Sequence, residues 1–208
     1  MYKNIIFDMG NVLIMFYPEK TFSKYLDNKE DVDKIMNVFY RSGAYRECDR
    51  GTKTYAEVIE EVTPLLPEHL IAVIKKLYLE NGFGKTEMPV FPEMYDLILE
   101  LKANGYKTYL LSNAGYDFYE YSPLKPAIGL MDGKIISCEH KVLKPEKEIY
   151  EILFNTYSLD PAECIFIDDV AENIEGGKKC GMDGIVFSPS FEDVSVLREK
   201  LRNKGIKI

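Results

Sequence analysis

Polar side chains that could do chemistry follow short apolar runs at several places in the sequence. Asp8 ends the run IIFD, the pair Ser112-Asn113 ends TYLLSN, and the pair Asp168-Asp169 ends CIFIDD. A lysine, Lys144, stands in KVLKPEKEIY after a further apolar run. Aspartates often do no more than cap turns and helices, and that role accounts for Asp8 alone equally well. Four such endings in one chain favour a shared site instead.

The chemistry that these residue types suit is phosphoryl transfer. Carboxylates that lie close together raise one another's pKa values, and a divalent cation relieves the repulsion. Hard oxygen ligands of this kind favour Mg²⁺. Asp8 could then attack phosphorus, while Ser112 and backbone N–H groups around Asn113 hold the other phosphate oxygens. Lys144 would supply positive charge to the phosphate and to the attacking carboxylate. We therefore predict a Mg²⁺ cofactor and a small phosphorylated metabolite as substrate.

The elements that must position these residues are strands alternating with helices. Five apolar runs rich in β-branched residues predict buried strands: Ile5–Asp8, Thr108–Ser112, Ile135–Cys138, Cys164–Asp168 and Gly184–Ser188. Helical patterns lie between several of them: Met94–Asn104, Glu146–Tyr157 (opened by Lys144-Pro145) and Ala171–Cys180. This alternation predicts an α/β fold with a three-layer, Rossmann-like parallel sheet. Ligands bind at the carboxyl ends of the strands in such sheets, which is where the polar residues stand.

The segment from residue 17 to residue 85 has a different pattern. It shows helical periodicity throughout, as in KTFSKYLDNKEDVDKIMNVFYRS and TYAEVIEEV, and no convincing strand. We predict a small helical cap over residues 17–85, inserted after the first strand, and a catalytic core made of residues 1–16 and 86–208.

The bulk composition limits the partners and the compartment. The 208 residues include 26 Lys and Arg against 34 Asp and Glu, a formal net charge of −8. This balance argues against nucleic acid or an anionic membrane as the main partner. Four scattered cysteines without a CxxC pair predict reduced thiols in a cytoplasmic protein. The N-terminus lacks a signal-like stretch, and both a monomer and a homodimer fit the sequence.

The stretches IIFDMGNVL, LLSNAG, KPEKEIY and FIDDVAENIEGG, in this order, resemble the four motifs of the haloacid dehalogenase-like hydrolase superfamily. The helical insertion is similar to the C1-type cap of that superfamily. RECDRG at residues 46–51 and IDDVAENIEGGKKCGM look most like the subgroup of bacterial α-D-glucose-1-phosphate phosphatases. The resemblance implies Mg²⁺-dependent hydrolysis of a small phosphomonoester, such as a hexose 1-phosphate, through an aspartyl-phosphate.

The resemblance also implies a role for each motif residue. Asp8 would be nucleophile and metal ligand, and the Gly10 carbonyl a second ligand. Asp169 would be the direct carboxylate ligand, with Asp168 as a further ligand or a support beside it. Asn173 would brace Asp169, although a plain helix-surface asparagine accounts for it equally well. Phosphate would be bound by Ser112, Asn113 and Lys144.

One position departs from the pattern of these phosphatases. Most carry a second aspartate two residues after the nucleophile, which protonates the leaving alcohol and later activates water, and here that residue is Gly10. General acid–base assistance is worth about 10²–10⁴ in rate. Asp49, Glu47, His140 or solvent could supply the proton instead. The cap residues Arg46, Asp49 and Arg50 are also predicted to contact the substrate.

Two other functions compete with the phosphatase. The first is a non-catalytic module that binds a phosphometabolite or a protein through the same pocket. The second is a dehalogenase, because those relatives also lack the second aspartate. Dehalogenases act on carbon without Mg²⁺, however, and the acidic pair Asp168-Asp169 suits a metal site, so we rank this alternative last.

Overall fold

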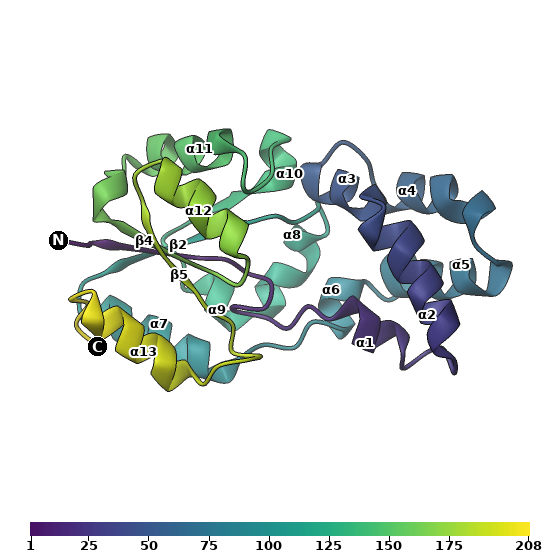
Figure 1. Ribbon diagram of the computed structural model, residues 1–208, viewed down its shortest axis with the longest axis horizontal. Helices are drawn as coiled ribbons and strands as arrows, with labels where there is room; N and C mark the ends of the chain where they lie inside the picture. Colours follow the sequence, from purple (N-terminus) through teal and green to yellow (C-terminus); the bar gives the residue numbers. More distant parts are fainter.

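The structure is a computed structural model that describes all 208 residues. Its centre is a five-stranded parallel sheet in the order β3-β2-β1-β4-β5 (Figure 1). The strands are β1 (Asn4–Phe7), β2 (Lys107–Ser112), β3 (Gly133–Ile136), β4 (Cys164–Asp168) and β5 (Asp183–Val186). The predicted parallel α/β architecture is confirmed. The prediction for the third strand was wrong at its end, because Ser137 and Cys138 begin the short helix α10 (Ser137–His140).

The central strand β1 sets the position of the first aspartate. Ile5, Ile6 and Phe7 are fully buried, as expected for a strand that is covered on both faces. Phe7 is in register with Leu110 of β2 and with Ile167 of β4. The residues that follow Phe7 and Ile167 therefore emerge at the same edge of the sheet.

Helices cover both faces of the sheet. On one face lie α11 (Lys147–Tyr157) and α12 (Ala171–Lys179), and on the other α7 (Pro92–Ala103), α9 (Pro126–Gly129) and α13 (Val194–Asn203) (Figure 1). Neighbouring strand residues point to opposite faces, so Ile6 packs into the first layer while Ile5 and Phe7 pack into the second. This alternation produces the three layers.

All the helices of residues 17–85 lie at one end of the molecule, away from both termini (Figure 1). They are α1 (Pro18–Phe22), α2 (Lys29–Ile35), a π-helical turn (Met36–Arg41), α3 (Ala44–Arg50), α4 (Tyr55–Val62), α5 (Glu68–Lys75), a second π-helical turn (Lys76–Glu80) and α6 (Phe83–Thr86). Two backbone hydrogen bonds join the chain segments that enter and leave this region. The Met15 N–H donates to the Pro89 carbonyl at 2.7 Å, and the Phe91 N–H donates to the Leu13 carbonyl at 3.1 Å. The remaining elements are α8 (Phe118–Tyr121) and three 3₁₀ turns (Thr63–Leu65, Ser122–Leu124, Pro161–Glu163).

The chain around Lys144 differs from the prediction that Lys-Pro opens a helix. The Lys144-Pro145 peptide is cis, and the Glu146 N–H closes a turn onto the Leu143 carbonyl at 2.7 Å. The helix α11 begins only at Lys147. The Lys144 side chain is buried. None of the helices is both long and apolar enough to cross a membrane.

Candidate active site

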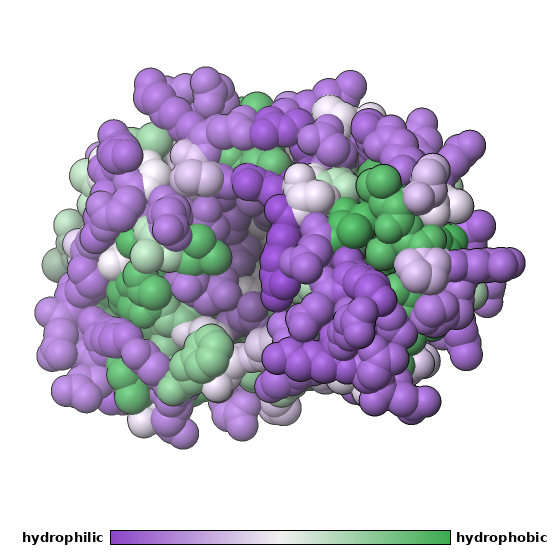
Figure 2. Space-filling model, turned by 45° about the vertical axis from the view of Figure 1, so that its right-hand side comes forward, coloured by the Kyte–Doolittle hydropathy of each residue, from purple (hydrophilic) through white to green (hydrophobic).

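A cavity of about 220 Å³ lies between the carboxyl edge of the sheet and the helices of residues 17–85. The surface is hollowed between these two parts, and its rim is mostly hydrophilic (Figure 2). The ionisable carboxyl and amino groups of its lining are Asp8, Asp49, Asp117, Asp169 and Lys144. Four carboxyls thus share the cavity with a single amino group.

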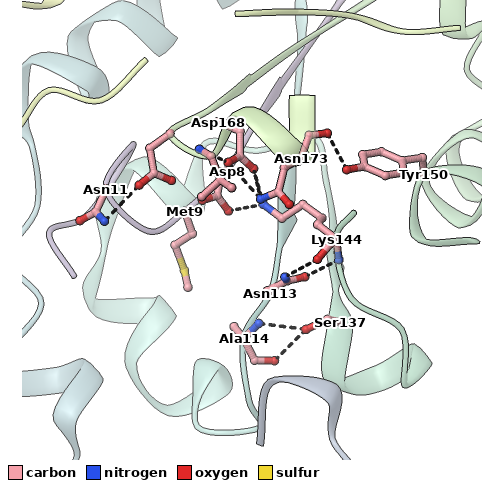
Figure 3. Close-up of polar contacts among 12 residues, drawn as sticks. Asp8, Met9, Asn11, Asn113, Ala114, Ser137, Lys144, Tyr150, Asp168 and Asn173 are labelled. Carbon is pink, nitrogen blue, oxygen red and sulfur yellow. Dashed lines mark hydrogen bonds and ion pairs between the residues drawn. The ribbon is translucent and has the colours of Figure 1, made fainter. Parts of the chain in front are cut away.

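Lys144 joins the carboxylates at the floor of the cavity. Its ammonium donates to Asp8 Oδ1 at 2.6 Å and to Asp168 Oδ2 at 2.7 Å (Figure 3). The ammonium also lies 5.1 Å from the centre of the Phe166 ring. Lys144 is 2% exposed and Asp168 fully buried. Burial alone would lower the pKa of Lys144, but the two carboxylates raise it above its ordinary value.

Asp168 has its oxygens occupied by the protein. Besides Lys144, the side-chain amide of Asn173 donates to both Asp168 oxygens at 3.1 Å (Figure 3). The Val170 N–H donates to Oδ1 at 2.8 Å. The prediction that Asn173 braces Asp169 was therefore wrong. Asn173 lies on the first turn of α12, whose packing turns its side chain toward the carboxylate that ends β4.

Asp169 keeps more of its carboxylate free. Its only side-chain partner is Asn11, whose amide donates to Asp169 Oδ2 at 3.2 Å. Asn11 itself is fixed by the Phe16 N–H, which donates to Asn11 Oδ1 at 2.9 Å. Its backbone φ is +54°, a left-handed conformation that asparagine tolerates better than most residues. The sequence reasoning missed Asn11, although an asparagine at such a turn after Gly10 was a usable signal.

Asp8, Asp168 and Asp169 form one oxygen cluster that could hold a metal ion. One carboxylate oxygen from each lies within 4.8 Å of the others. Burial raises the pKa of Asp8 to about 7 despite the opposing charge of Lys144, and the charges of Asp168 and Asp169 add to the rise. Burial and the Asp168 charge also raise the pKa of Asp169. Three carboxylates against one ammonium leave an excess of negative charge, and hard oxygen donors of this kind fit Mg²⁺.

Groups suited to an anion lie at the ends of β1 and β2. The Ser112 hydroxyl is buried without a hydrogen-bond partner. The side chain of Asn113 is held by the backbone of Lys144: its amide donates to the Lys144 carbonyl at 3.1 Å and its oxygen accepts from the Lys144 N–H at 2.8 Å (Figure 3). The backbone N–H groups of Met9, Gly10 and Asn113 make no hydrogen bond within the protein, and all three residues line the cavity. Asn113 therefore offers its backbone N–H to an anion, while its side chain fixes the Lys144 backbone.

The cavity lining also includes two further carboxyls, Asp49 from the helical segment 17–85 and Asp117 after β2, and an aromatic wall. Burial and the nearby Asp117 charge raise the pKa of Asp49 to about 8. Asp117 Oδ1 accepts from the Tyr55 hydroxyl at 3.2 Å, and burial raises its own pKa to about 6. The aromatic lining consists of Phe16, Tyr45, Tyr55, Tyr78, Phe83 and Tyr121.

The two arginines predicted to contact substrate do not line the cavity. Arg46 is exposed. Arg50 forms a forked ion pair with Glu146, with Nη2–Oε1 2.5 Å and Nη1–Oε2 3.1 Å. His140 is also exposed, and the Glu47 carboxylate accepts from Thr52 Oγ1 at 2.6 Å. Of the sequence-predicted cap residues, Asp49 alone reaches the cavity.

A family model described as haloacid dehalogenase-like hydrolase matches residues 2–181 of the chain. Two curated relatives are similar over nearly their full length. D-ribitol-5-phosphate phosphatase of Bacteroides thetaiotaomicron is 25% identical over 91% of this chain and 92% of its own. The sesquiterpene phosphatase astK of Aspergillus oryzae is 27% identical over 95% of this chain and 96% of its own.

Solved structures share the fold. The HAD family enzyme bt-2542 of Bacteroides thetaiotaomicron, solved as a complex with magnesium and inorganic phosphate, superposes with a TM-score of 0.71 at 24% identity, covering 95% of this chain and 99% of that one. L-2-haloacid dehalogenase of Xanthobacter autotrophicus superposes with a TM-score of 0.62 at 18% identity, covering 88% and 76%. At these identities the likeness establishes the fold alone.

Proposed function

The chain belongs to the haloacid dehalogenase-like hydrolase family and is a phosphoric monoester hydrolase, and we propose that it works by attack of Asp8 on the phosphorus of a small phosphomonoester, with Mg²⁺ as cofactor. The observation that carries this proposal is the contact of the Lys144 ammonium with both Asp8 and Asp168. This contact holds Asp8 Oδ1 in place at the cavity floor. It leaves the other carboxylate oxygen of Asp8 without a protein partner.

The charge of Lys144 favours the ionised form of Asp8, which is the form that can attack. Burial opposes the ionisation of Asp8, whereas the Lys144 charge favours it, and a bound cation would favour it as well. Asp8, the Gly10 carbonyl and Asp169 would hold the Mg²⁺, because Asp168 already accepts four hydrogen bonds from the protein. When bound, the cation neutralises charge on the phosphate and on the attacking carboxylate.

The phosphate would be held at the ends of β1 and β2. The Ser112 hydroxyl and the N–H groups of Met9, Gly10 and Asn113 are donors without partners in the protein. Donors that are fixed in advance stabilise the charge that spreads over the phosphoryl oxygens during transfer. Lys144 adds the one positive charge on this floor.

The lining also limits the organic part of the substrate. Beyond the phosphate site the cavity offers carboxyls and tyrosine hydroxyls and no arginine or lysine. A second anionic group on the substrate would be repelled by the charge of Asp117. A neutral, hydroxyl-rich group fits, because its hydroxyls can donate to carboxyl oxygens and its carbon skeleton can pack on aromatic faces. A sugar or alditol phosphate, including the hexose 1-phosphate predicted from the sequence, is the substrate class that we propose, and the relative named for ribitol 5-phosphate supports it.

We further propose that residues 17–85 act as a cap over the core of residues 1–16 and 86–208. Substrate must enter between these parts, since both line the cavity. Closure of the cap would exclude water while Asp8 attacks, and reopening would admit the water that completes the reaction.

Phosphate release tests the proposal directly. The substrates would be a hexose 1-phosphate, an alditol phosphate and p-nitrophenyl phosphate, each with Mg²⁺ and with EDTA. We expect Mg²⁺-dependent release by the native protein and by Asp27→Asn, an exposed cap carboxylate without hydrogen-bond partners, and none by Asp8→Asn. Release by Asp8→Asn at the native rate would refute the role of Asp8. A folded, Mg²⁺-binding protein that releases phosphate from none of the three would favour a binding module, and halide release from a 2-haloacid in EDTA would favour a dehalogenase.

A further inference from the structure

We propose that Asp49, at the end of the cap helix α3, supplies the proton to the leaving alcohol and later takes the proton of the attacking water. This inference rests on the proposed function, and it assigns to a cap residue the work that Gly10 cannot do.

Asp49 is the free carboxyl of the cavity. It lines the same space as Asp8 and Gly10, and its carboxyl oxygens make no hydrogen bond or ion pair. The other three lining carboxylates are each bonded to a neighbour: Asp8 to Lys144, Asp169 to Asn11, and Asp117 to Tyr55. A carboxyl that exchanges a proton with a substrate oxygen must have an oxygen that is not already hydrogen-bonded to the protein.

The surroundings keep Asp49 protonated near neutral pH. Burial, the Asp117 charge and the Asp8 charge favour its neutral form, while the charges of Arg46 and Lys144 oppose it, and the resulting pKa is about 8. The hydroxyl of Tyr55 partly offsets the burial of Asp117, whose pKa is about 6. Burial raises the pKa of the lining tyrosines as well, so these stay neutral: Tyr45, Tyr55, Tyr78 and Tyr121. Two neighbouring carboxyls whose pKa values are pushed apart can take different roles.

Three contacts hold the end of α3 against the core. The Ser137 hydroxyl donates to the Asp49 carbonyl. Gly51, at φ +73°, packs so closely on α10 that a Cβ there would lie 2.3 Å from the Cys138 carbonyl oxygen. Both terminal nitrogens of Arg50 pair with the carboxylate of Glu146, which lies two residues after Lys144. Arg50 is thus a positioning residue that ties the chain beside Asp49 to the loop that carries Lys144.

In the first step a carboxylate oxygen of Asp8 forms a bond to phosphorus, and the bond from phosphorus to the ester oxygen breaks. The ester oxygen keeps the bonding electrons and takes the proton of Asp49. The products are the alcohol, the aspartyl-phosphate on Asp8 and the Asp49 carboxylate.

In the second step a water oxygen attacks the same phosphorus and gives one proton to the Asp49 carboxylate. The bond from phosphorus to Asp8 breaks, its electrons return to the Asp8 carboxylate, and inorganic phosphate leaves. Because attack and departure are roughly in line, the water arrives where the alcohol left, so one residue can serve both steps.

The test compares leaving groups that differ in their need for a proton. In Asp49→Asn we expect kcat/KM for a sugar or alditol phosphate to fall about 10²–10⁴-fold. For p-nitrophenyl phosphate we expect kcat/KM to fall less than about tenfold, since nitrophenolate leaves with little protonation. Because water activation is also lost, the variant should release a burst of nitrophenol equal to the enzyme present and then turn over slowly.

Matched variants separate Asp49 from its neighbours. Asp27→Asn removes an exposed cap carboxylate and should match the native enzyme on both substrates. Asp117→Asn removes the cavity carboxyl whose charge acts on Asp49 and should not produce the dependence on the leaving group. Arg50→Ala should lower kcat on the sugar phosphate more than it raises KM, because it loosens Asp49 without removing it.

A rescue experiment distinguishes loss of the acid in Asp49→Asn from loss of the fold, because only a folded variant can regain activity. A Cβ on Gly10 would have Phe16 Cβ as its nearest neighbour, at 3.9 Å, and the Gly10 backbone is not left-handed. An aspartate therefore fits there, and Gly10→Asp should restore sugar-phosphate hydrolysis to Asp49→Asn.

Equal losses on both substrates in Asp49→Asn, or no loss on either, would overturn the proposal. A dependence on the leaving group in Asp117→Asn would overturn it in favour of that residue. The proposed function would survive both results as long as Asp8→Asn is inactive, and it would fail if Asp8→Asn hydrolysed p-nitrophenyl phosphate.

Discussion

Replacing Lys144 with methionine tests the central ion-pair network. Methionine keeps an unbranched chain of similar length and removes the charge. Each ammonium–carboxylate contact, at 2.6 and 2.7 Å, is worth about 6 kcal/mol at an effective dielectric constant of about 20. Desolvation of the buried ions offsets much of this attraction. Removal of one partner of a buried pair typically costs about 3–5 kcal/mol, because the remaining charges stay buried without compensation.

We therefore expect Lys144→Met to lose about 3–5 kcal/mol of unfolding free energy, measured by urea denaturation in EDTA. Lys102→Met is the matched control. Lys102 forms an ion pair of similar length with Asp132, 2.8 Å, but the two side chains are 30% and 24% exposed. A pair near the surface should contribute less than about 1 kcal/mol. Equal losses in the two variants, or a loss below 1 kcal/mol for Lys144→Met, would refute the view that burial makes this network decisive.

Three further changes have defined outcomes. Asn173→Ala removes two hydrogen bonds from the buried Asp168 carboxylate and should cost about 1.5–3 kcal/mol of unfolding free energy in a urea titration. Gly84→Ala would place a Cβ 2.0 Å from the Tyr121 ring, so we expect a loss of about 1–3 kcal/mol in a urea titration. Asp49 binds a proton in the folded protein up to a pKa of about 8 but releases it near 3.9 when unfolded, so native stability falls as pH rises between these values. The melting temperature of Asp49→Asn should therefore rise relative to that of the native protein as the pH is raised from 5 to 9.

The polar endings of the apolar runs were enough to predict the floor of the site. Parallel strands bring their carboxyl ends to one edge, so the positions of Asp8 and Asp168 along the chain imply that they meet. The structure places their strands side by side and in register. Local periodicity also separated the α/β core from the purely helical segment, because side-chain burial repeats differently in strands and helices.

Other parts of the site could not be derived from periodicity. The partner of Asn173 depends on the rotation of α12 about its axis, which packing against the sheet decides. The Asn173 amide donates to Asp168, whereas the prediction had it brace Asp169. The end of the third strand was misplaced for a similar reason, since Ser137 turns into α10 to meet the cap.

What the sequence by itself determined is the set of groups at the strand ends and the absence of an acid at Gly10, because these follow from residue type and chain order. Which side chains of residues 17–85 face that floor was decided only by the tertiary structure. Asp49 reaches the cavity and Arg50 does not, although they are neighbours, because the close contact of Gly51 with Cys138 and the ion pair of Arg50 with Glu146 fix how α3 docks. Those contacts join residues about 90 positions apart, and no local pattern encodes them.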